Sequence, residues 1–364
     1  MRFLFLEPFF GGSHRDFAEG LVEHSRHDID LLTLPARFWK WRMRGAALHF
    51  INAIDNLDGY DGIISGGLLS LADFTALCGP HRPPVLLYFH ENQLTYPLAP
   101  GERMDLQFGF TDITSALCAD RILFNSRFHM DRFFDALPVF ISRMPEFKPY
   151  WAIDTIGKKA DVLYPGCQFN DAPADPLPLT DGAPIIVWNH RWQFDKNPEA
   201  FFAALEAIDR SGIDFRLVLL GENCQVKPKA FITARSRFES QIRQYGYVKS
   251  KAEYIAWLQK GLVAVSTANQ ENFGISMVEA MRYGCLPLMP RRLAYPEILP
   301  TEFHAAFLYR SQEELVEKLA DLLLHPDRHV IHRPVLADMM ARHAWPAVIE
   351  RYDRELEELV KSRG

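Results

Sequence analysis

Short apolar runs alternate with segments of helical period along almost the whole chain, and this alternation constrains the fold more than any other feature. The first set of runs reads as strands at 2–6, 28–34, 61–65, 84–90, 121–125 and 161–164. A second set follows at 185–192, 215–221, 261–268, 285–290 and 305–309, with helical segments such as 197–211 and 311–325 between the strands. Strands that alternate with helices pair in parallel, so the pattern predicts α/β architecture with helices on both faces of each sheet.

The two sets of strands are separated by a proline-rich stretch without hydrophobic period, and 364 residues suffice for two domains. We therefore predict two doubly wound, Rossmann-like domains that face each other across a cleft. The predicted boundaries are 1–167 for the first domain, 168–184 for a linker and 185–345 for the second domain. The charged amphipathic segment 346–364 is expected to form a helix that packs back on the first domain.

Charge and composition narrow the function classes. The formal net charge is −6, so binding to nucleic acid would have to come from a local basic patch. The five cysteines form no CxxC pair, and no apolar stretch approaches the roughly 18–20 residues that span a bilayer. At the N-terminus, Glu7 and Pro8 interrupt the apolar run that a signal peptide would need. We expect a cytoplasmic protein that has no metal site and does not enter membranes.

The segment "QENFGISMVEAMRYGCLPL" (270–288) carries the strongest chemical signal. It follows a predicted strand and enters a helix near Gly274, which makes an anion site from backbone N–H groups and the helix dipole. Glu271 and Glu279 lie beside this turn. Carboxylates repel a bound phosphate, so they are suited to accept hydrogen bonds from sugar and ribose hydroxyls. The alternative is an ordinary solvated helix start.

The segment "NHRWQFDKNPEAFF" (189–202) follows the first strand of the second domain. Arg191 and Lys196 would project from the carboxyl end of that strand, where doubly wound folds bind ligands. Asn197 and Pro198 read as an N-cap followed by a first helical residue. Two cations near the 271–279 turn suit a diphosphate, whereas the alternative is a salt-bridging surface turn.

In the first domain, two polar segments follow predicted strands. The turn "GGSH" (11–14) includes Gly12, Ser13 and His14, which permit close approach of a ligand or simply cap a helix. His90 begins the second segment, directly after an apolar run, and a lone histidine there is more often structural than functional. Further polar residues in the same surroundings are Glu91, Asn92, Gln93 and Asn125.

A basic and aromatic stretch, "ARFWKWRMRG" (36–45), stands out in this acidic chain. On a helix from about 37 to 54, Trp39 falls on the apolar stripe, while other residues share the adjoining face. These residues are Arg37, Lys40, Arg44 and, at the edge of the face, Trp41. Three stacked cations beside an exposed tryptophan suit single-stranded RNA, and the alternatives are a plain surface helix or a membrane-surface helix.

Several of these motifs together resemble a known family. Glu271 and Glu279, with Arg191 and Lys196 upstream, resemble the donor site of retaining GT-B-fold glycosyltransferases of family 4. "EPFFGGSHRDF" (7–17), "LPARFWKWRMR" (34–44) and "LLYFHENQLTYP" (86–97) are similar to the tRNA-queuosine α-mannosyltransferase family, and the likeness runs nearly end to end.

The resemblance implies transfer of mannose from GDP-mannose to the cyclopentenediol of queuosine in a tRNA anticodon, with tRNA-Asp as the expected substrate. It implies retention of configuration, GDP-mannose as co-substrate and no metal or other cofactor. His90 and Glu271 would be the catalytic residues. Donor contacts would come from Gly12, Arg191, Lys196, Tyr247, Val248, Phe273, Gly274, Ile275 and Glu279. Acceptor contacts would come from Ser13, His14, Arg37, Lys40, Trp41, Arg44, Glu91, Asn92, Gln93 and Asn125.

Other functions remain open at this point. A family 4 transferase that acts on a lipid or polysaccharide would share the donor motif, and sugar-nucleotide 2-epimerases have overlapping donor sites. A non-catalytic tRNA-binding protein is the alternative from another class. The sequence does not indicate the oligomeric state.

Overall fold

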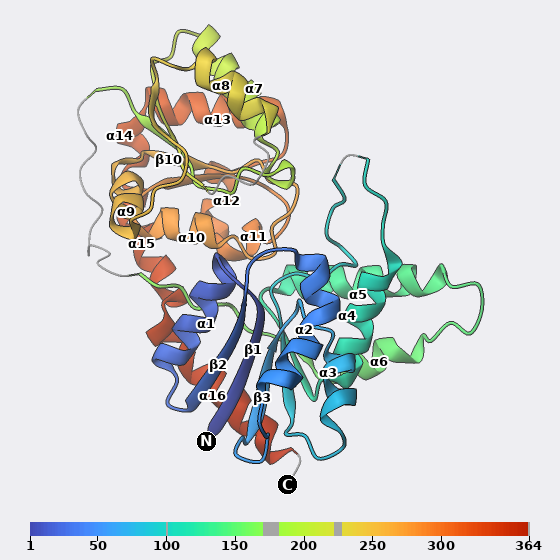
Figure 1. Ribbon diagram of the computed structural model, residues 1–364. Coiled ribbons are helices and arrows are strands. Elements are labelled where there is room, and N and C mark those ends of the chain that lie inside the picture. Colours follow the sequence, from blue (N-terminus) through green and yellow to red (C-terminus); the bar gives the residue numbers. More distant parts are fainter. Residues whose placement is uncertain (100, 170–181, 222–227, 363–364) are drawn as a thin grey trace. The chain divides into compact units, whose positions relative to one another are not determined.

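The chain folds into two compact units. The computed structural model describes residues 1–99, 101–169, 182–221 and 228–362 (Figure 1). One unit comprises Met1–Gln168 together with His343–Gly364, and the other comprises Phe169–Arg342. Most of the predicted linker 168–184, namely 170–181, lies outside the described residues.

The described part of the first unit contains a six-stranded parallel sheet in the order β2-β1-β3-β4-β5-β6. The strands are β1 (Arg2–Phe10), β2 (Asp28–Pro35), β3 (Gly62–Gly66), β4 (Val85–Phe89), β5 (Arg121–Phe124) and β6 (Ala160–Val162). Strand β1 has β2 on one side and β3 on the other, so the direction of winding reverses beside it. This reversal is the topological switch point at which such folds bind ligands.

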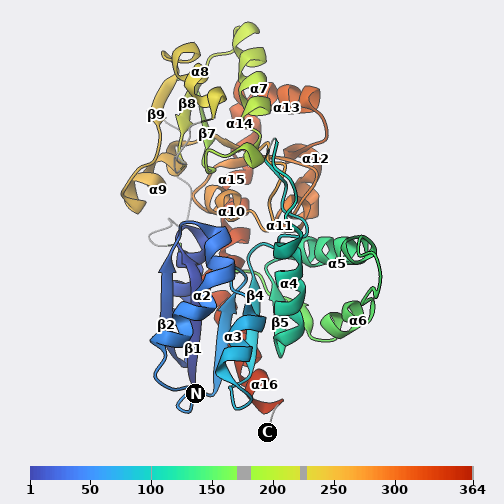
Figure 2. The same ribbon diagram turned by 45° about the vertical axis from the view of Figure 1, so that its right-hand side comes forward.

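Strand β1 is longer than the predicted 2–6, because Phe10 still pairs with Pro35 of β2 after a register shift. Its alternate residues face opposite layers. Phe3 and Phe5 belong to one buried cluster, while Leu4 and Leu6 belong to another. Helices therefore cover both faces of the sheet, as predicted (Figure 2).

The first cluster contains side chains of α1 (Ser13–His24) and α16 (Trp345–Lys361), and the second contains side chains of the remaining helices of this unit. Those helices are α2 (Trp39–Ala53), α3 (Leu71–Cys78), α4 (Leu106–Cys118), α5 (Arg127–Ser142) and α6 (Trp151–Gly157).

Helix α16 packs on the first unit although it follows the second unit in the chain. Trp345, at its first turn, is fully buried and lies against Phe17 and Tyr352. Two glycines leave room for the indole: a Cβ at Gly20 would lie 1.9 Å from Trp345 Nε1, and one at Gly166 would lie 2.2 Å from its Cδ2. The indole is thus enclosed by segments from both ends of this unit.

The described part of the second unit contains another six-stranded parallel sheet, in the order β12-β11-β10-β7-β8-β9. The strands are β7 (Ile185–Trp188), β8 (Arg216–Leu219), β9 (Ile242–Tyr245), β10 (Val263–Val265), β11 (Leu286–Pro290) and β12 (Leu308–Tyr309). Winding reverses between β7 and β10, which places a second switch point there. The polar edge strand β9 was absent from the predicted set, and 305–307 is helical, not extended.

The helices of this unit connect and cover these strands. They are η1 (Phe194–Lys196), α7 (Pro198–Arg210), α8 (Lys229–Arg237), α9 (Lys251–Lys260), α10 (Ile275–Arg282), α11 (Tyr295–Ile298), η2 (Thr301–Phe303), α12 (His304–Phe307), α13 (Gln312–Leu324), α14 (Pro326–His329) and α15 (His332–Met340), with η3 (Ala341–His343) leading back to the first unit. Asn197 caps α7 and Pro198 begins it, as predicted. Among the described residues, no helix combines the length and the apolar composition that crossing a membrane requires.

Candidate functional site

At the carboxyl ends of β1 and β4, four ionisable side chains of the first unit lie together. His14, near the start of α1, has its Nδ1 3.3 Å from Glu7 Oε1 and its Nε2 3.1 Å from Glu91 Oε2. The His90 ring lies over the His14 ring, with 4.2 Å between centroids. The structure therefore brings together the predicted residues His14, His90 and Glu91, and it adds Glu7, which sequence reasoning missed.

The two histidines of this group titrate in opposite directions. Burial lowers the pKa of His14, but the carboxylates of Glu91 and Glu7 outweigh burial and raise it to about 10. Burial and the neighbouring His14 and His129 hold the pKa of His90 well below its usual range. His14 is thus an imidazolium near neutral pH, whereas His90 is a neutral imidazole.

The ligand atoms of Glu7, His14 and His90 lie within 4.8 Å of one another, a spacing that a metal ion would accept. However, both ring nitrogens of His14 are within hydrogen-bond distance of a carboxylate. A neutral imidazole has one donor and one acceptor nitrogen, and only the imidazolium donates from both. We therefore assign this group as an ion-paired cluster.

Asn92 and Asn125, predicted as acceptor contacts, have buried side chains that bind other parts of the protein. Asn92 Nδ2 donates to Nε2 of His129 over 2.8 Å, and His129 Nδ1 donates to Asn125 Oδ1 over 2.8 Å. Asn125 Nδ2 in turn donates to the carbonyl of His90. Burial lowers the pKa of His129 to about 3, which matches this neutral tautomer. The network fixes the loop after β4, and it gives these asparagines a positioning role.

The rest of this loop is also held from within. The backbone N–H of Gln93 donates to Asp112 of α4, whose pKa burial raises well above its usual range. The Gln93 side chain is half-buried. Gly12 and Ser13 are exposed at the start of α1, where Gly12 has a φ of 52°. Neither Ser13 nor His14 caps this helix, so the capping interpretation of the turn is wrong.

In the second unit, the turn after β7 meets the turn after β10. Lys196 Nζ donates to the carbonyl of Gln270 over 2.7 Å and lies 3.3 Å from Glu271 Oε2. It is also 3.3 Å from Asp195 Oδ2, a buried carboxylate that the sequence interpretation did not single out. Thr267 Oγ1 donates to the carbonyls of Lys196 and Asn197, which ties the two turns together. The expected proximity of Lys196 and Glu271 is therefore present.

Helix α10 begins at Ile275, four residues after Glu271, and Gly274 is its N-cap. Gly274 has a φ of 99°, in the left-handed region that favours glycine, and Tyr295 and Ile298 pack within 3.3 Å of where a Cβ would be. Phe273 is buried and Ile275 is partly exposed as the first residue of the helix. The first bonds of the helix run from the N–H groups of Met277 and Val278 to the Gly274 carbonyl. The N–H groups of Ile275 and Ser276 lie ahead of these bonds, so the turn suits an anion.

Glu279, one turn further along α10, is held by helix α9. Lys251 Nζ donates to Glu279 Oε1, and the Tyr254 hydroxyl donates to Oε2 over 3.0 Å. Neither partner was identified from the sequence. Tyr247 and Val248 lie in the segment between β9 and α9, with Tyr247 exposed and Val248 nearly buried.

Arg191 is exposed on the turn after β7. This turn and the α9 segment surround the start of α10, because Lys196 contacts Glu271 and Lys251 contacts Glu279. The carboxyl ends of β7, β9 and β10 thus converge on one set of polar side chains.

The basic and aromatic stretch differs in part from its prediction. Phe38 has a left-handed backbone with φ 56°, so α2 begins at Trp39 and Arg37 lies outside it. The expected stack of three cations on one helix face is therefore wrong. Lys40 Nζ pairs with Glu102 Oε1 at 2.6 Å, and Arg44 donates to Thr111 Oγ1 over 3.2 Å.

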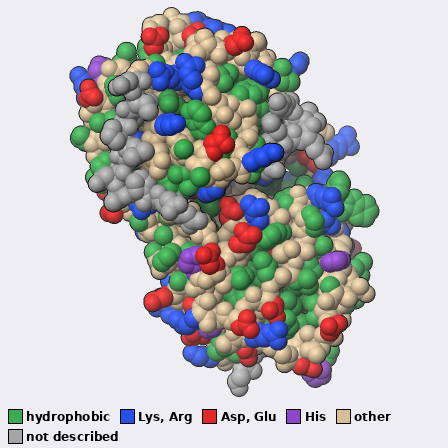
Figure 3. Space-filling model, turned by 60° about the vertical axis from the view of Figure 1, so that its left-hand side comes forward, with side chains coloured by type: hydrophobic (Ala, Val, Ile, Leu, Met, Phe, Trp, Pro, Cys, Tyr) green, Lys and Arg blue, Asp and Glu red, His purple; other side chains and the backbone are tan. Residues whose placement is uncertain are grey.

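Other features of this stretch are as predicted. Trp39 packs against Phe108 in a buried cluster, and Trp41 is 78% exposed. Among the side chains drawn in colour in Figure 3, acidic and basic ones are interspersed.

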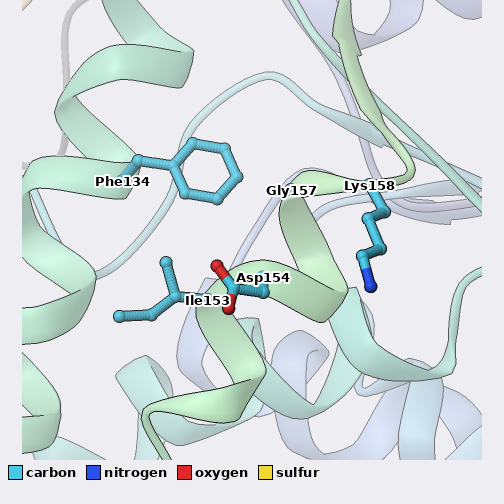
Figure 4. A pocket seen from close by; sticks show the side chains of 5 residues that line it. All are labelled: Phe134, Ile153, Asp154, Gly157 and Lys158. Carbon is cyan, nitrogen blue, oxygen red and sulfur yellow. The ribbon is translucent and has the colours of Figure 1, made fainter.

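A separate hollow of the first unit lies between α5 and α6 (Figure 4). It is lined by Phe134, Ile153, Asp154, Gly157 and Lys158. Gly157 and Lys158 come just before β6, so they lie near the amino end of that strand. The side chains described above lie at the carboxyl ends of β1 and β4. None of the predicted site residues lines it.

Comparisons with known proteins bear on both units. Residues 2–167 match the model for the tRNA-queuosine alpha-mannosyltransferase N-terminal domain, and residues 173–333 match that for glycosyl transferases group 1. The tRNA-queuosine alpha-mannosyltransferase of Drosophila melanogaster is 35% identical over 337 residues, covering 89% of this chain and 87% of the relative.

Solved structures support the fold. A sucrose-phosphate synthase from Thermosynechococcus elongatus superposes with a TM-score of 0.75 at 15% identity, covering 100% of both chains. Anabaena HepE in complex with UDP superposes with a TM-score of 0.66 at 15% identity, covering 98% of this chain and 100% of the other. With two parallel six-stranded sheets covered by helices, the fold is GT-B, as predicted.

Proposed function

The chain belongs to the tRNA-queuosine α-mannosyltransferase family and is a glycosyltransferase, and on this premise we propose that it transfers mannose from GDP-mannose to queuosine in tRNA. The observation that carries the proposal is the junction of Lys196 and Glu271 beside the start of α10. It combines a cation, a carboxylate and the backbone N–H groups of a helix start, which are the groups that a nucleotide sugar requires.

The diphosphate of the donor would bind at the first turn of α10, with Lys196 and Arg191 as its cations. As the bond between sugar and phosphate breaks, negative charge grows on the departing diphosphate. Fixed cations and backbone dipoles stabilise that charge without reorganising, which is commonly the largest catalytic contribution. Lys196 is held in place by Gln270 and two carboxylates, so it is oriented before the substrate arrives.

The two glutamates would recognise hydroxyl groups. Glu279 would accept hydrogen bonds from the ribose, in exchange for part of its contact with the half-exposed Lys251. Glu271 would accept hydrogen bonds from the hexose. The backbone near Tyr247 and Val248 would contact the guanine base.

The acceptor would approach the strand ends of the first unit. His90 would lie beside the anomeric carbon, and Glu91, at the partly exposed end of its cluster, would accept a hydrogen bond from a cyclopentenediol hydroxyl. We propose attack from the face that the diphosphate leaves, with retention of configuration. The departing phosphate oxygen would take the hydroxyl proton, so the reaction requires neither a metal ion nor a carboxylate nucleophile.

The anticodon loop would contact the α2 region through Arg37, Lys40, Trp41 and Arg44, with Trp41 as a stacking platform for a base. We propose tRNA-Asp as substrate and the cytoplasm as the site of action. The fold alone would equally suit a transferase for a lipid or polysaccharide, and the family match over residues 2–167 favours tRNA.

Radiolabelled GDP-mannose, incubated with the protein and with tRNA that contains or lacks queuosine, tests this function. We expect label only in queuosine-containing tRNA. Lys196→Ala and Glu271→Ala should abolish transfer and leave tRNA binding unchanged, while Lys229→Ala, an exposed cation of α8, should behave as wild type. Label in lipid, or none in queuosine tRNA, would refute the proposal.

A further inference from the structure

The buried cluster around His14 contains a carboxylate that the proposed reaction does not use. Glu7 is fully buried. Its Oε1 accepts a hydrogen bond from the Phe9 backbone N–H over 2.9 Å and another from His14 Nδ1 over 3.3 Å. Gly66 makes room for it, since a Cβ there would lie 2.6 Å from Glu7 Oε2. A side chain this costly to bury needs a compensating partner, and the imidazolium of His14 is that partner.

The three groups form a series from the interior to the surface. The side chains of Glu7, His14 and Glu91 are 0%, 7% and 21% exposed. Glu91 is therefore the member that a ligand reaches, and Glu7 reaches the ligand only through His14.

We propose that Glu7 is a positioning residue: its carboxylate keeps His14 as an imidazolium, which holds the Glu91 carboxylate in one orientation for a substrate hydroxyl. This inference rests on the proposed function for the identity of the substrate, and on the contacts of His14 with Glu7 and Glu91 for the positioning role. The protein moves no proton in the proposed step, because both ring nitrogens of His14 stay protonated throughout.

The reason lies in the hydrogen-bond inventory of histidine. If His14 were neutral, its single N–H would serve one carboxylate, and its lone pair would face the other. An acceptor facing the Glu91 carboxylate would repel it and release the side chain. With an uncharged amide at position 7, Nδ1–H can still donate to the amide oxygen, which leaves the lone pair of Nε2 toward Glu91.

Other ionisable groups near this cluster do not supply the positive charge that a neutral His14 would lack. They are His90 after β4, Tyr88 of β4, Asp112 of α4 and His129 of α5. Burial holds both of these histidines and the tyrosine neutral, since it lowers the pKa of His90 and His129 and raises that of Tyr88. The raised pKa of His14, about 10, agrees with the arrangement.

The first part of the test uses the wild-type protein. Nitrogen-15 NMR of its histidines at pH 8, with the His14 signals assigned by their loss in His14→Gln, should show both ring nitrogens protonated. A neutral His14 at this pH, or a metal ion bound in the cluster, would overturn the proposal. This result does not depend on which substrate the enzyme uses, so it is separate from any failure of the mannosyltransferase assignment.

The second part compares Glu7→Gln with Glu19→Gln, which removes the same charge from the exposed face of α1. Removal of one close carboxylate should lower the pKa of His14 by about 1–3 units. We expect kcat of Glu7→Gln to fall by about 2- to 100-fold at pH 9 and to approach wild type at pH 6, with unchanged affinity for GDP. Glu19→Gln should match wild type throughout. A Glu7→Gln defect that is equal at pH 6 and pH 9 would overturn the inference, because a purely structural role gives no such recovery.

Discussion

Two glycines enclose Trp345, and this packing determines whether replacing one of them, Gly20, by alanine stabilises or destabilises the protein. Gly20 lies within α1, where alanine would ordinarily stabilise the helix by about 1 kcal/mol. Its Cβ, however, would lie 1.9 Å from a fully buried indole. Overpacking a core costs about 1–3 kcal/mol, and at this distance the upper part of that range applies. We therefore expect Gly20→Ala to destabilise the first unit by about 1–2 kcal/mol.

Gly45→Ala is the matched control. Gly45 lies within α2, and beyond its own helix backbone no atom of the described residues comes within 4 Å of the position of its Cβ, so the same change should stabilise by about 0.5–1 kcal/mol. For a unit of this size each kcal/mol shifts Tm by about 2–4 °C. Thermal unfolding followed by circular dichroism, with amide exchange in α1 and α16 to localise the change, should show opposite shifts for the two variants.

The clash itself is tested by removing the ring. Trp345→Leu alone should destabilise the protein by several kcal/mol, but Gly20→Ala should cost little in that background, with a coupling of about 1–3 kcal/mol. If Gly20→Ala is as stable as Gly45→Ala, or if its cost persists without the indole, the packing described for α16 is incorrect.

Three further predictions concern the candidate site. Tyr254→Phe removes a hydrogen bond to Glu279 and should weaken GDP binding by about 2–10-fold in calorimetry, and an unchanged Kd would contradict the role of that tyrosine. The double charge reversal Lys40→Glu with Arg44→Glu should weaken tRNA binding and flatten its salt dependence. Unaltered affinity would mean that α2 is a plain surface helix without a role in tRNA binding. The raised pKa of His14 makes its contribution to stability complete below pH 6.5 and lost as the pH rises toward 10, so the excess unfolding free energy of wild type over His14→Gln should decline across that interval.

The elements that sequence reasoning located well are those with strong periodicity or clear caps. The apolar cores of both sheets were found, and so was the start of α7 at Asn197 and Pro198, because hydrophobic period and capping chemistry are local signals. Strand β9 was missed because "IRQY" is a polar edge strand, whose pairing with β8 depends on tertiary structure.

The candidate site shows the same division. Lys196 and Glu271 could be paired from sequence because both follow strands that the topology brings together. Glu7 and His129 could not be identified from the sequence, because each acts through a hydrogen-bond partner that only the folded structure brings close. The helix start at Trp39 was misjudged because a left-handed conformation at Phe38 has no sequence signal.

The return of α16 to the first unit also governs the order in which the protein can fold during synthesis. The buried face formed by Phe3, Phe5 and Phe17 is completed by side chains that are translated only after the whole second unit. Ribosomes add about 5–20 residues per second, so roughly 10–35 s pass before α16 is synthesised and can pack on this face. The second unit, whose residues are contiguous, can fold within that interval. Phe3, Phe5 and Phe17 are thus translated before the second unit and reach their full packing only after it.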